Sequence, residues 1–165
     1  MGEYQHAEHA FGPVCDGASE ILILGSFPSV KSREASFYYH HPQNRFWRLL
    51  SLLYEENFPQ SIEERRAFLL RRHIALWDVI ESCDIIGSSD TSIRNVRPVD
   101  LGEILNRASI RKIYGNGTKA CQLYRRYCEK ACGRPIHPLP STSPANAAWS
   151  LERLREAWAC ILETN

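Results

Sequence analysis

Short apolar runs alternate with longer helical patterns along the chain, and together they predict a sheet covered by helices. The first run, Ile21 to Leu24, is continuously apolar and is followed by glycine, as is typical of a buried parallel strand. Comparable runs mark three more predicted strands, at residues 74–80, 110–114 and 135–139. Helical patterns fill the other stretches, at residues 46–54, 61–73, 100–108, 118–132 and 145–162. Strands that alternate with helices predict a three-layer α/β/α domain with a mainly parallel four-stranded sheet.

Polar stretches between these elements set the expected domain organisation. Residues 1–19 are polar and predict an irregular lead-in, and residues 81–97 predict a polar loop. The sequence has no internal repeat, linker or low-complexity tract, so a single domain is expected over residues 20–165. Within this domain, Ser61 followed three residues later by Glu64 resembles a capping box that starts a helix.

Loops of unusual composition follow the four predicted strands, at residues 25–47, 81–97, 115–118 and 140–146. In a parallel α/β sheet, ligands bind outside the carboxyl ends of the strands. The topology therefore predicts that these loops converge on one rim and form a single site.

The segment from Phe37 to Trp47, with the sequence FYYHHPQNRFW, is the most distinctive part of these loops. Its first aromatic residues follow neither the spacing of a strand nor that of a helix. Flat rings beside amides suit a pocket wall that sandwiches a planar ligand and reads its edge. We therefore predict a binding site for an aromatic compound such as a nucleobase. Phe46 and Trp47 begin a helical pattern and are expected in the core.

Composition and charge change this picture little. Charged residues make up 24% of the 165 residues and hydrophobic residues 44%, as in ordinary globular proteins. The formal net charge of +1 provides no global basic field, and local pairs such as Arg65-Arg66 are expected on solvated helix faces. A DNA-scanning enzyme needs only a modest basic face, because every phosphate contact steepens the salt dependence of binding.

The six cysteines favour neither a metal site nor a disulfide framework. No CxxC pair is present, whereas zinc and iron–sulfur sites usually need close pairs on a turn. Cys121, Cys128 and Cys132 lie at helical spacing instead. We expect reduced cysteines, no metal and no cofactor.

Membrane and export signals are not apparent in the sequence. No stretch is apolar over the roughly 18 residues that a transmembrane helix requires. The N-terminal segment contains Glu3 and Glu8 and does not resemble a signal peptide. A cytoplasmic protein without a membrane partner is therefore expected, associated with the bacterial nucleoid if it acts on DNA, and the compartment is otherwise left open.

Four motifs occur in a defined order along the chain. They are Leu-Gly-Ser-Phe-Pro-Ser at 24–29, Pro-Gln-Asn-Arg-Phe-Trp at 42–47, Ile-Tyr-Gly-Asn-Gly-Thr-Lys-Ala at 113–120 and Leu-Pro-Ser-Thr-Ser-Pro at 139–144. The ordered set resembles the uracil-DNA glycosylase superfamily, and it is most similar to the hypoxanthine-DNA (deoxyinosine) glycosylase branch. The resemblance implies a monofunctional base-excision repair enzyme. Such an enzyme hydrolyses the N-glycosidic bond of a damaged or mismatched base that is flipped out of double-stranded DNA.

The departures from the superfamily pattern concern the catalytic groups. Phe27 stands where other branches place a water-activating aspartate or asparagine, and Leu139 stands where uracil-specific relatives place a histidine. The resemblance to the hypoxanthine branch implies that Asn44 is the catalytic residue instead. We expect its amide oxygen to orient the attacking water, while backbone N–H groups near Gly25 and Ser26 stabilise the departing base. Asparagine is also a common helix cap, and this alternative stays open for Asn44.

The resemblance and the loop positions together predict the remaining site residues. The expected base-binding residues are Gly25, Ser26, Phe27, Phe37, Tyr39 and Asp78. The expected DNA-binding residues are Ser29, Ser88, Ser89, Ser141, Thr142, Ser143 and Asn146. Hydroxyls and turn amides contact phosphates without adding net charge, and the Ser141–Asn146 loop is expected to press into the minor groove. A plain turn role stays open for Asp78, and His40 and His41 suit either acid–base chemistry or the surface.

Three other functions stay open at this point. The first is excision of uracil or thymine from mismatches by the same fold, which Phe27 and Leu139 disfavour. The second is a catalytically silent binder of damaged or single-stranded nucleic acid. The third is an enzyme that hydrolyses free nucleosides, which would not need a loop that opens a duplex. We expect a monomer.

Overall fold

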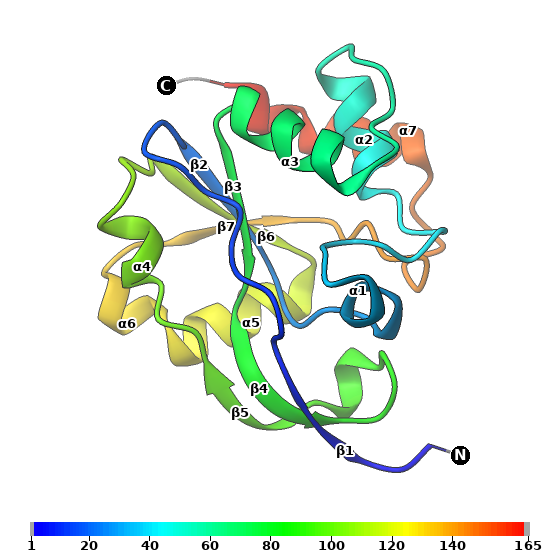
Figure 1. The fold of residues 1–165 in the computed structure, drawn as a ribbon, viewed down its shortest axis with the longest axis vertical. Helices are drawn as coiled ribbons and strands as arrows, with labels where there is room; N and C mark the ends of the chain where they lie inside the picture. The colour runs from blue at the N-terminus through cyan, green and yellow to red at the C-terminus, as the bar shows by residue number, and fades with distance from the viewer. Residues whose placement is uncertain (1, 164–165) are drawn as a thin grey trace.

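Four parallel strands form the central sheet of the computed structural model, which describes residues 2–163 (Figure 1). They are β2 (Ile21–Gly25), β3 (Ile74–Asp78), β6 (Lys112–Asn116) and β7 (Ile136–Leu139). Their order is β3-β2-β6-β7, and every neighbouring pair is parallel. All residues of β2 and β3 are buried, as expected of strands covered on both faces. The predicted parallel four-stranded sheet is confirmed.

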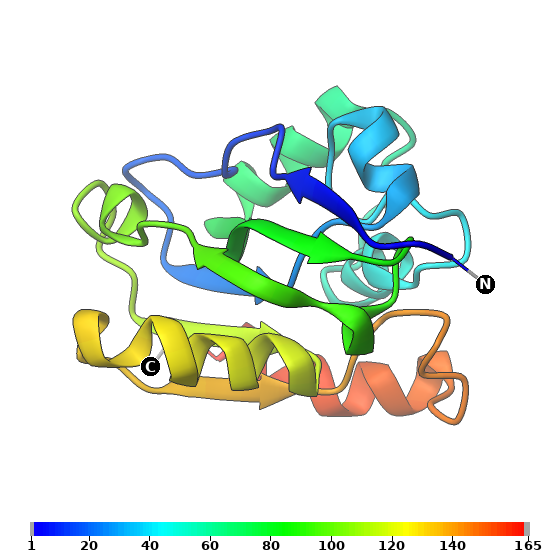
Figure 2. The same ribbon diagram turned by 90° about the horizontal axis from the view of Figure 1, so that it is seen from below.

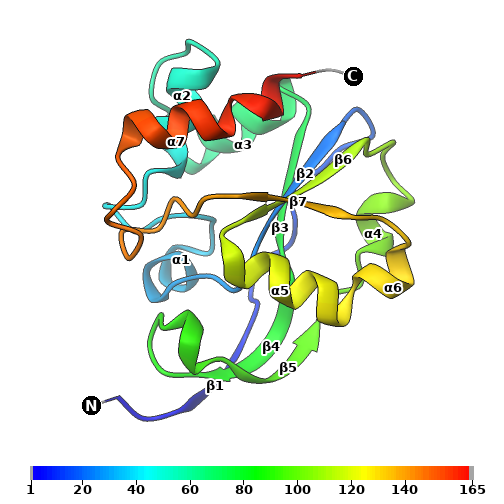
Figure 3. The same cartoon turned by 180° about the vertical axis from the view of Figure 1, so that it is seen from behind.

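Helices cover both faces of this sheet, which confirms the three-layer prediction. The helices are α1 (Val30–Ala35), α2 (Phe46–Leu53), α3 (Ile62–Arg71), α4 (Gly102–Leu105), α5 (Thr118–Tyr127), α6 (Glu129–Cys132) and α7 (Leu151–Trp158). Two 3-10 helices, η1 (Asp90–Ser92) and η2 (Ala159–Leu162), add single turns. Helices α2, α3 and α7 lie together on one side of the sheet, and α5 and α6 lie on the other (Figures 1 and 3).

A second sheet of three antiparallel strands was not predicted. It contains β1 (Gln5–Glu8), β4 (Ile80–Ile85) and β5 (Arg94–Pro98) in the order β1-β4-β5 (Figure 2). The expectation that residues 1–19 are irregular and that 81–97 form a polar loop is therefore wrong in these stretches. β1 and β5 have mostly exposed side chains, so their sequences lack the alternation that marks a half-buried strand.

The chain passes from the first sheet to the second through a single residue, Val79. The Val79 N–H donates to the Gly25 carbonyl at 2.9 Å, and the Ile80 N–H donates to the Ser26 carbonyl at 3.1 Å. These bonds continue the β2–β3 pairing beyond the end of both strands. They hold Asp78, the last residue of β3, beside Gly25, the last residue of β2.

Local capping explains where several helices begin and end. Ser61 Oγ accepts from the Glu64 N–H at 3.0 Å, which confirms the predicted start of α3. The predicted helix 118–132 is interrupted at Cys128, which separates α5 from α6. The last helix begins later than predicted, because Ser150 Oγ accepts from the Arg153 N–H at 3.1 Å and so starts α7.

Large aromatic side chains fill the core between the sheet and the helices α2, α3 and α7. Phe46, Trp47 and Trp158 are fully buried, which confirms the core prediction for the first two. Burial of one such side chain contributes about 1.5–3 kcal/mol. Across residues 2–163, no helix combines the length and the apolar character needed to cross a bilayer.

Candidate active site

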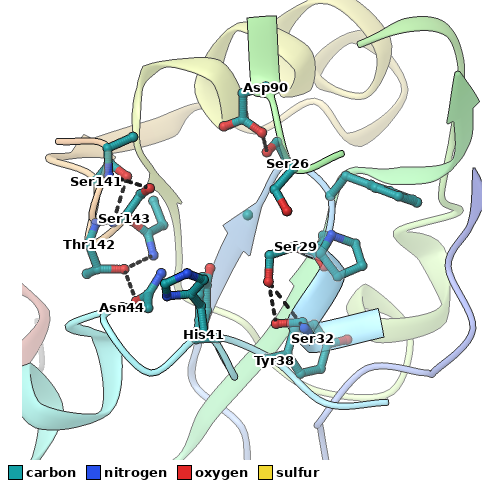
Figure 4. A pocket seen from close by; sticks show the side chains of 18 of the residues that line it. Ser26, Ser29, Ser32, Tyr38, His41, Asn44, Asp90, Ser141, Thr142 and Ser143 are labelled. Carbon is teal, nitrogen blue, oxygen red and sulfur yellow. Dashed lines mark hydrogen bonds between the residues drawn. The ribbon is translucent and has the colours of Figure 1, made fainter. Parts of the chain in front are cut away.

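A cavity of about 300 Å³ opens at the carboxyl ends of the parallel strands (Figure 4). Residues from all four predicted loops line it, which confirms that these loops converge on one rim. The lining residues are Gly25, Ser26, Phe27, Pro28, Ser29, Ser32, Tyr38, Tyr39, His41, Asn44, Asp78, Ser88, Asp90, Asn116, Ser141, Thr142, Ser143, Pro144 and Ala145. A cavity of this size suits a small organic ligand.

Asp78 supplies a buried carboxylate to the cavity. Its side chain is only 4% exposed, and its Oδ2 accepts a hydrogen bond from His9 Nε2 at 2.8 Å. A Cβ at Gly25 would clash with Asp78 Oδ1 and would lie 2.9 Å from the Tyr39 hydroxyl. Only glycine at position 25 therefore lets the carboxylate approach the end of β2.

His9 was not predicted as a site residue, and no motif in the lead-in marks it. Its ring is buried beside the Phe11 ring, with centroids 4.5 Å apart, and meets the Phe27 ring edge-on at 6.1 Å. Among residues 2–163, His9 Nδ1 has no hydrogen-bond partner. The neutral ring therefore carries its proton on Nε2, where Asp78 accepts it. This hydrogen bond fixes which carboxylate oxygen faces away from His9.

Tyr39 adds a buried hydroxyl near the same carboxylate. Desolvation raises the pKa of Tyr39, and the nearby charge of Asp78 raises this pKa further. Its oxygen is buried without a hydrogen-bond partner in the described part of the chain. The ring stacks on Phe46 at a centroid distance of 4.2 Å, and the backbone φ of +50° is rare for a bulky residue. Tyr39 is therefore held in position as a neutral hydroxyl close to Asp78, and nearby Asn116 lowers its pKa in opposition to the rise.

The side-chain amide oxygen of Asn44 accepts two hydrogen bonds from the protein. Asn44 Oδ1 accepts from the Phe46 N–H at 2.9 Å and from Thr142 Oγ1 at 2.8 Å. Thr142 in turn pairs with Asn116, which accepts from the Thr142 N–H and donates to its hydroxyl, both at 3.1 Å. The Phe46 N–H requires an acceptor, so the amide cannot be turned the other way.

The hydrogen bonds of Asn44 correct the expected role of its oxygen. A carbonyl oxygen has two lone pairs, and both accept from the protein here. The oxygen therefore has no free lone pair with which to orient a water. The amide oxygen also accepts from the first N–H of α2, from the position before the N-cap Arg45, so Asn44 helps to start this helix as the alternative interpretation held. The NH₂ group is the part of Asn44 that is left for a ligand.

Asp90 is a second carboxylate in the cavity, and the sequence did not identify it. It begins η1, in the segment between β4 and β5, and its Oδ1 accepts from Ser26 Oγ at 2.9 Å (Figure 4). The residue as a whole is exposed, yet its carboxylate lies inside the rim. Desolvation raises the pKa of Asp90, Asp78 raises it further, and the Ser26 hydrogen bond opposes the shift.

The profile of the Uracil DNA glycosylase superfamily matches residues 11–162 of the chain. The chain belongs to this superfamily. A hypoxanthine DNA glycosylase of Methanosarcina barkeri is 36% identical over 155 residues, which cover 92% of this chain and 96% of that protein. A hypoxanthine DNA glycosylase of Methanosarcina acetivorans is 34% identical, with coverage of 93% and 97%.

A solved structure shows the same fold. The solution NMR structure of a putative uracil DNA glycosylase from Methanosarcina acetivorans superposes with a TM-score of 0.76 and 32% sequence identity. The match covers 93% of this chain and 97% of that one. The protein is a DNA glycosylase, as the sequence motifs indicated. The superfamily match, the two curated relatives and the shared fold all agree on this.

Most of the residues predicted for the glycosylase site line the cavity. They are Asn44, Gly25, Ser26, Phe27, Tyr39, Asp78, Ser29, Ser88, Ser141, Thr142 and Ser143. Their roles toward a base or DNA stay predictions. Phe27 is largely buried. The Arg33 guanidinium lies over its ring at 5.4 Å from the centroid, so one face of the ring already makes a cation–π contact within the protein.

Three predicted residues do not line the cavity of the glycosylase, and a fourth lies deeper than expected. Phe37 is 1% exposed and stacks on Trp47 at 6.0 Å, so its assignment to base binding is wrong. Ser89 is exposed outside the cavity, and Asn146 uses its amide to bind the Ser141 carbonyl. Thr142 is fully buried, and its hydroxyl joins two asparagines rather than facing DNA.

The two neighbouring histidines separate in the structure of the glycosylase. His41 lines the cavity, and its Nδ1 accepts from the Gln43 N–H at 3.1 Å. His40 is exposed and lies outside the cavity. Only His41 is placed to meet a ligand, through Nε2.

Arg45 holds the loop that follows β7 in the glycosylase. Its guanidinium donates to the carbonyls of Ser143 at 2.9 Å and Asn146 at 3.1 Å, and also to the Trp149 carbonyl. The Arg45 N–H donates to the Thr142 carbonyl at 3.1 Å. The planar guanidinium of arginine spreads its N–H donors over three nitrogens and so reaches several separate carbonyls, whereas all donors of lysine lie on one nitrogen. Arg45 therefore fixes the shape of the loop predicted to enter the minor groove.

Proposed function

We propose that this glycosylase releases hypoxanthine from double-stranded DNA by hydrolysis of the bond between base and sugar. The observation that carries the proposal is the buried Asp78 carboxylate at the end of β3, with hydrogen-bond donors beside it. The names of the two Methanosarcina relatives support the same base.

The chemistry of deamination explains why a carboxylate suits this base. Adenine presents an unprotonated ring nitrogen, N1, next to an amino group. Deamination to hypoxanthine turns N1 into an N–H donor and the amino group into a carbonyl. An ionised carboxylate only accepts hydrogen bonds, so Asp78 favours the N–H of hypoxanthine and repels the lone pair of adenine N1. The Tyr39 hydroxyl and the Asn44 amide supply donors for carbonyl oxygens.

Uracil is the second candidate for a specific reason. Like hypoxanthine, uracil carries a ring N–H, which in uracil lies between two carbonyl groups. Asp78 would accept a hydrogen bond from it in the same way. The two candidates differ in size and in the atoms of the purine's second ring. Excision of both bases is compatible with a pocket that reads the products of deamination.

Asn44 acts on the departing base in this proposal. The electron pair of the broken glycosidic bond leaves with the base, which becomes negatively charged. The Asn44 NH₂ group donates a hydrogen bond to the base as this charge develops. A donor that is already held in place costs no reorganisation during the reaction, and the two bonds to Asn44 Oδ1 hold it.

The depth of the site requires the base to leave the double helix. A base in a stacked duplex cannot reach Asp78, which lies at the buried end of the cavity. Flipping costs a few kcal/mol and is least costly at a mismatch such as hypoxanthine opposite thymine. The Ser141–Asn146 loop, which Arg45 holds through two of its carbonyls, is proposed to fill the gap that the base leaves.

A cleavage panel tests the proposed function. The purified protein in EDTA is mixed with duplexes that carry one hypoxanthine, uracil, xanthine or adenine, and abasic sites are then cut with alkali. We expect cutting at hypoxanthine and none at adenine. Cutting at uracil alone would replace the proposed base but keep the glycosylase. No cutting of any duplex, together with retained binding in gel shifts, would indicate a silent binder and contradict the proposal.

Replacing Arg45 with lysine is expected to separate duplex opening from chemistry. Lysine keeps the charge but has a single donor nitrogen in place of the two that reach the three carbonyls, so we expect the loop after β7 to lose its shape. A positioning element that is displaced by about 1 Å can cost about 10²-fold in rate. We expect a loss of this size on duplex substrate. Single-stranded hypoxanthine DNA needs no opening and should lose much less.

The measurement for Arg45→Lys is the single-turnover rate on both substrates. Arg48→Lys, an exposed arginine one turn along α2, is the matched control and should leave both rates unchanged. Equal losses on single-stranded and duplex DNA would show that Arg45 supports the chemistry and not the opening of the duplex.

A further inference from the structure

The proposed hydrolysis needs a group that accepts a proton from the attacking water, and neither Phe27 nor Asn44 nor Asp78 supplies one. Phe27 has no polar side-chain atom. Both lone pairs of Asn44 Oδ1 are used inside the protein. Asp78 is buried and hydrogen-bonded to His9, at the end of the cavity where the base would lie.

Asp90 has a free acceptor oxygen at the rim of the cavity, where the sugar of a flipped nucleotide would lie. Its Oδ1 is bound by Ser26, while no hydrogen bond to its Oδ2 occurs within residues 2–163. The two carboxylates of the cavity lie at different depths, because Asp78 is buried and Asp90 is an exposed residue whose carboxylate lines the rim. When a flipped base fills the deep end, its sugar stays at the rim. Asp90 is then beside the sugar and Asp78 beside the base.

The surroundings of Asp90 hold the carboxylate in place for this role. Ser26 comes directly after β2, so the hydrogen bond at 2.9 Å ties η1 to the end of the central strand. Desolvation raises the pKa of Asp90 and Asp78 raises it further, while the Ser26 hydrogen bond and the positive charge of Lys119, at the start of α5, oppose this rise. Figure 4 shows the Asp90 carboxylate next to Ser26, across the cavity from Asn44.

We infer that Asp90 is a further catalytic residue, which receives a proton from the attacking water and stabilises the positive charge on the sugar. The inference rests on the proposed function. The water oxygen forms a bond to C1′ of the sugar, and the bond between C1′ and the base breaks with its electron pair leaving on the base. One water proton passes to Asp90 Oδ2, and the base anion takes a proton from solvent. Asp90 then releases its proton to solvent, so the net reaction consumes one water.

A purely structural role for Asp90 is the main rival. In that case the carboxylate would only tie η1 to Ser26. Asp90→Asn separates the two roles, because an amide oxygen still accepts from Ser26 but neither takes a proton nor carries charge. Asp84→Asn is the matched control, since Asp84 lies on β4 outside the cavity and bonds His6 and Asn95 at the surface.

The test measures single-turnover release of hypoxanthine from duplex DNA, with binding followed by gel shift. General base catalysis contributes at least about a hundredfold, so we expect a loss of this size for Asp90→Asn with unchanged binding. Asp84→Asn should match the wild type. A second variant, Asp90→Gly, removes the side chain, and added formate is expected to restore part of its rate by supplying a carboxylate.

Three outcomes would overturn the inference. An active wild type with an undiminished Asp90→Asn rate, or an Asp90→Gly variant that formate does not restore, would overturn the inference alone. A wild type that releases no base from any duplex would overturn the proposed function, and the role of Asp90 with it.

Discussion

Asn44→Asp is expected to lower the rate of hypoxanthine excision by about 10²–10³-fold, the usual cost of removing one preorganised donor. Aspartate keeps an oxygen for the Phe46 N–H and for the Thr142 hydroxyl, so the cap of α2 and the link to the 140–146 loop are retained. The other oxygen replaces the NH₂ group and points an acceptor at the base. It would repel the negative charge that develops there.

The measurement for Asn44→Asp is a single-turnover rate, combined with thermal unfolding. The melting temperature should stay close to that of the wild type, since aspartate is as good a helix cap as asparagine. Asn57→Asp, on an exposed loop, makes the same chemical change away from the cavity and should have no effect on the rate. A rate equal to or above that of the wild type would show that position 44 serves the water rather than the base.

Asp78→Asn is expected to weaken the preference for hypoxanthine over adenine. His9 Nε2–H needs an acceptor and is expected to bind the new amide through its oxygen, because no residue within 2–163 bonds His9 Nδ1 and favours the other tautomer. The NH₂ group then faces the cavity, where it opposes the N–H of hypoxanthine and suits the lone pair of adenine N1. Loss of a hydrogen bond to a charged group costs about 1.5–3 kcal/mol, which corresponds to about 10–150-fold in rate.

Competition between hypoxanthine and adenine duplexes measures this effect directly. The ratio of the two excision rates should fall for Asp78→Asn and stay constant for the surface variant Asp84→Asn. His9→Ala supplies a second check, since it removes the hydrogen bond that orients the carboxylate and should lower the same ratio. An unchanged ratio in Asp78→Asn would show that Asp78 is a turn residue that does not read the base.

The two carboxylates of the cavity are proposed to act on different parts of the substrate. Asp78 lies where we propose that the base binds, and its neighbours are the His9 ring and the Tyr39 hydroxyl. Asp90 lies where we propose that the sugar remains, and its neighbour is Ser26. Asp78 raises the pKa of Asp90, so a change at either position is expected to affect the other. The double variant therefore need not show the sum of the two single effects.

Several features of this protein were determined by the sequence alone, because their causes are local. Apolar runs such as Ile21–Leu24 predict buried parallel strands wherever they occur, and the loops after such strands meet at one edge. The cap at Ser61 and the core positions of Phe46 and Trp47 follow from neighbouring residues in the same way. The ordered motifs by themselves indicate the superfamily whose profile matches residues 11–162.

Other features depended on contacts between distant segments, which no local pattern records. β1 and β5 have mostly exposed side chains and are strands only because β4 lies between them. His9 reaches Asp78 across 69 positions of sequence, and Asp90 reaches Ser26 across 64. Each of these polar side chains is unremarkable in its own segment and becomes part of the site only through its distant partner.

For Asn44, the sequence indicates which residue belongs to the site, and the tertiary structure decides which atom of its side chain is available. The motif identified the residue, and its place before a helix indicated a cap. The sequence does not reveal that the Thr142 hydroxyl, 98 positions away, takes the second lone pair of its oxygen. That one tertiary hydrogen bond decides that the amide offers the ligand a donor rather than an acceptor, because a carbonyl oxygen with two bonds has none left to give.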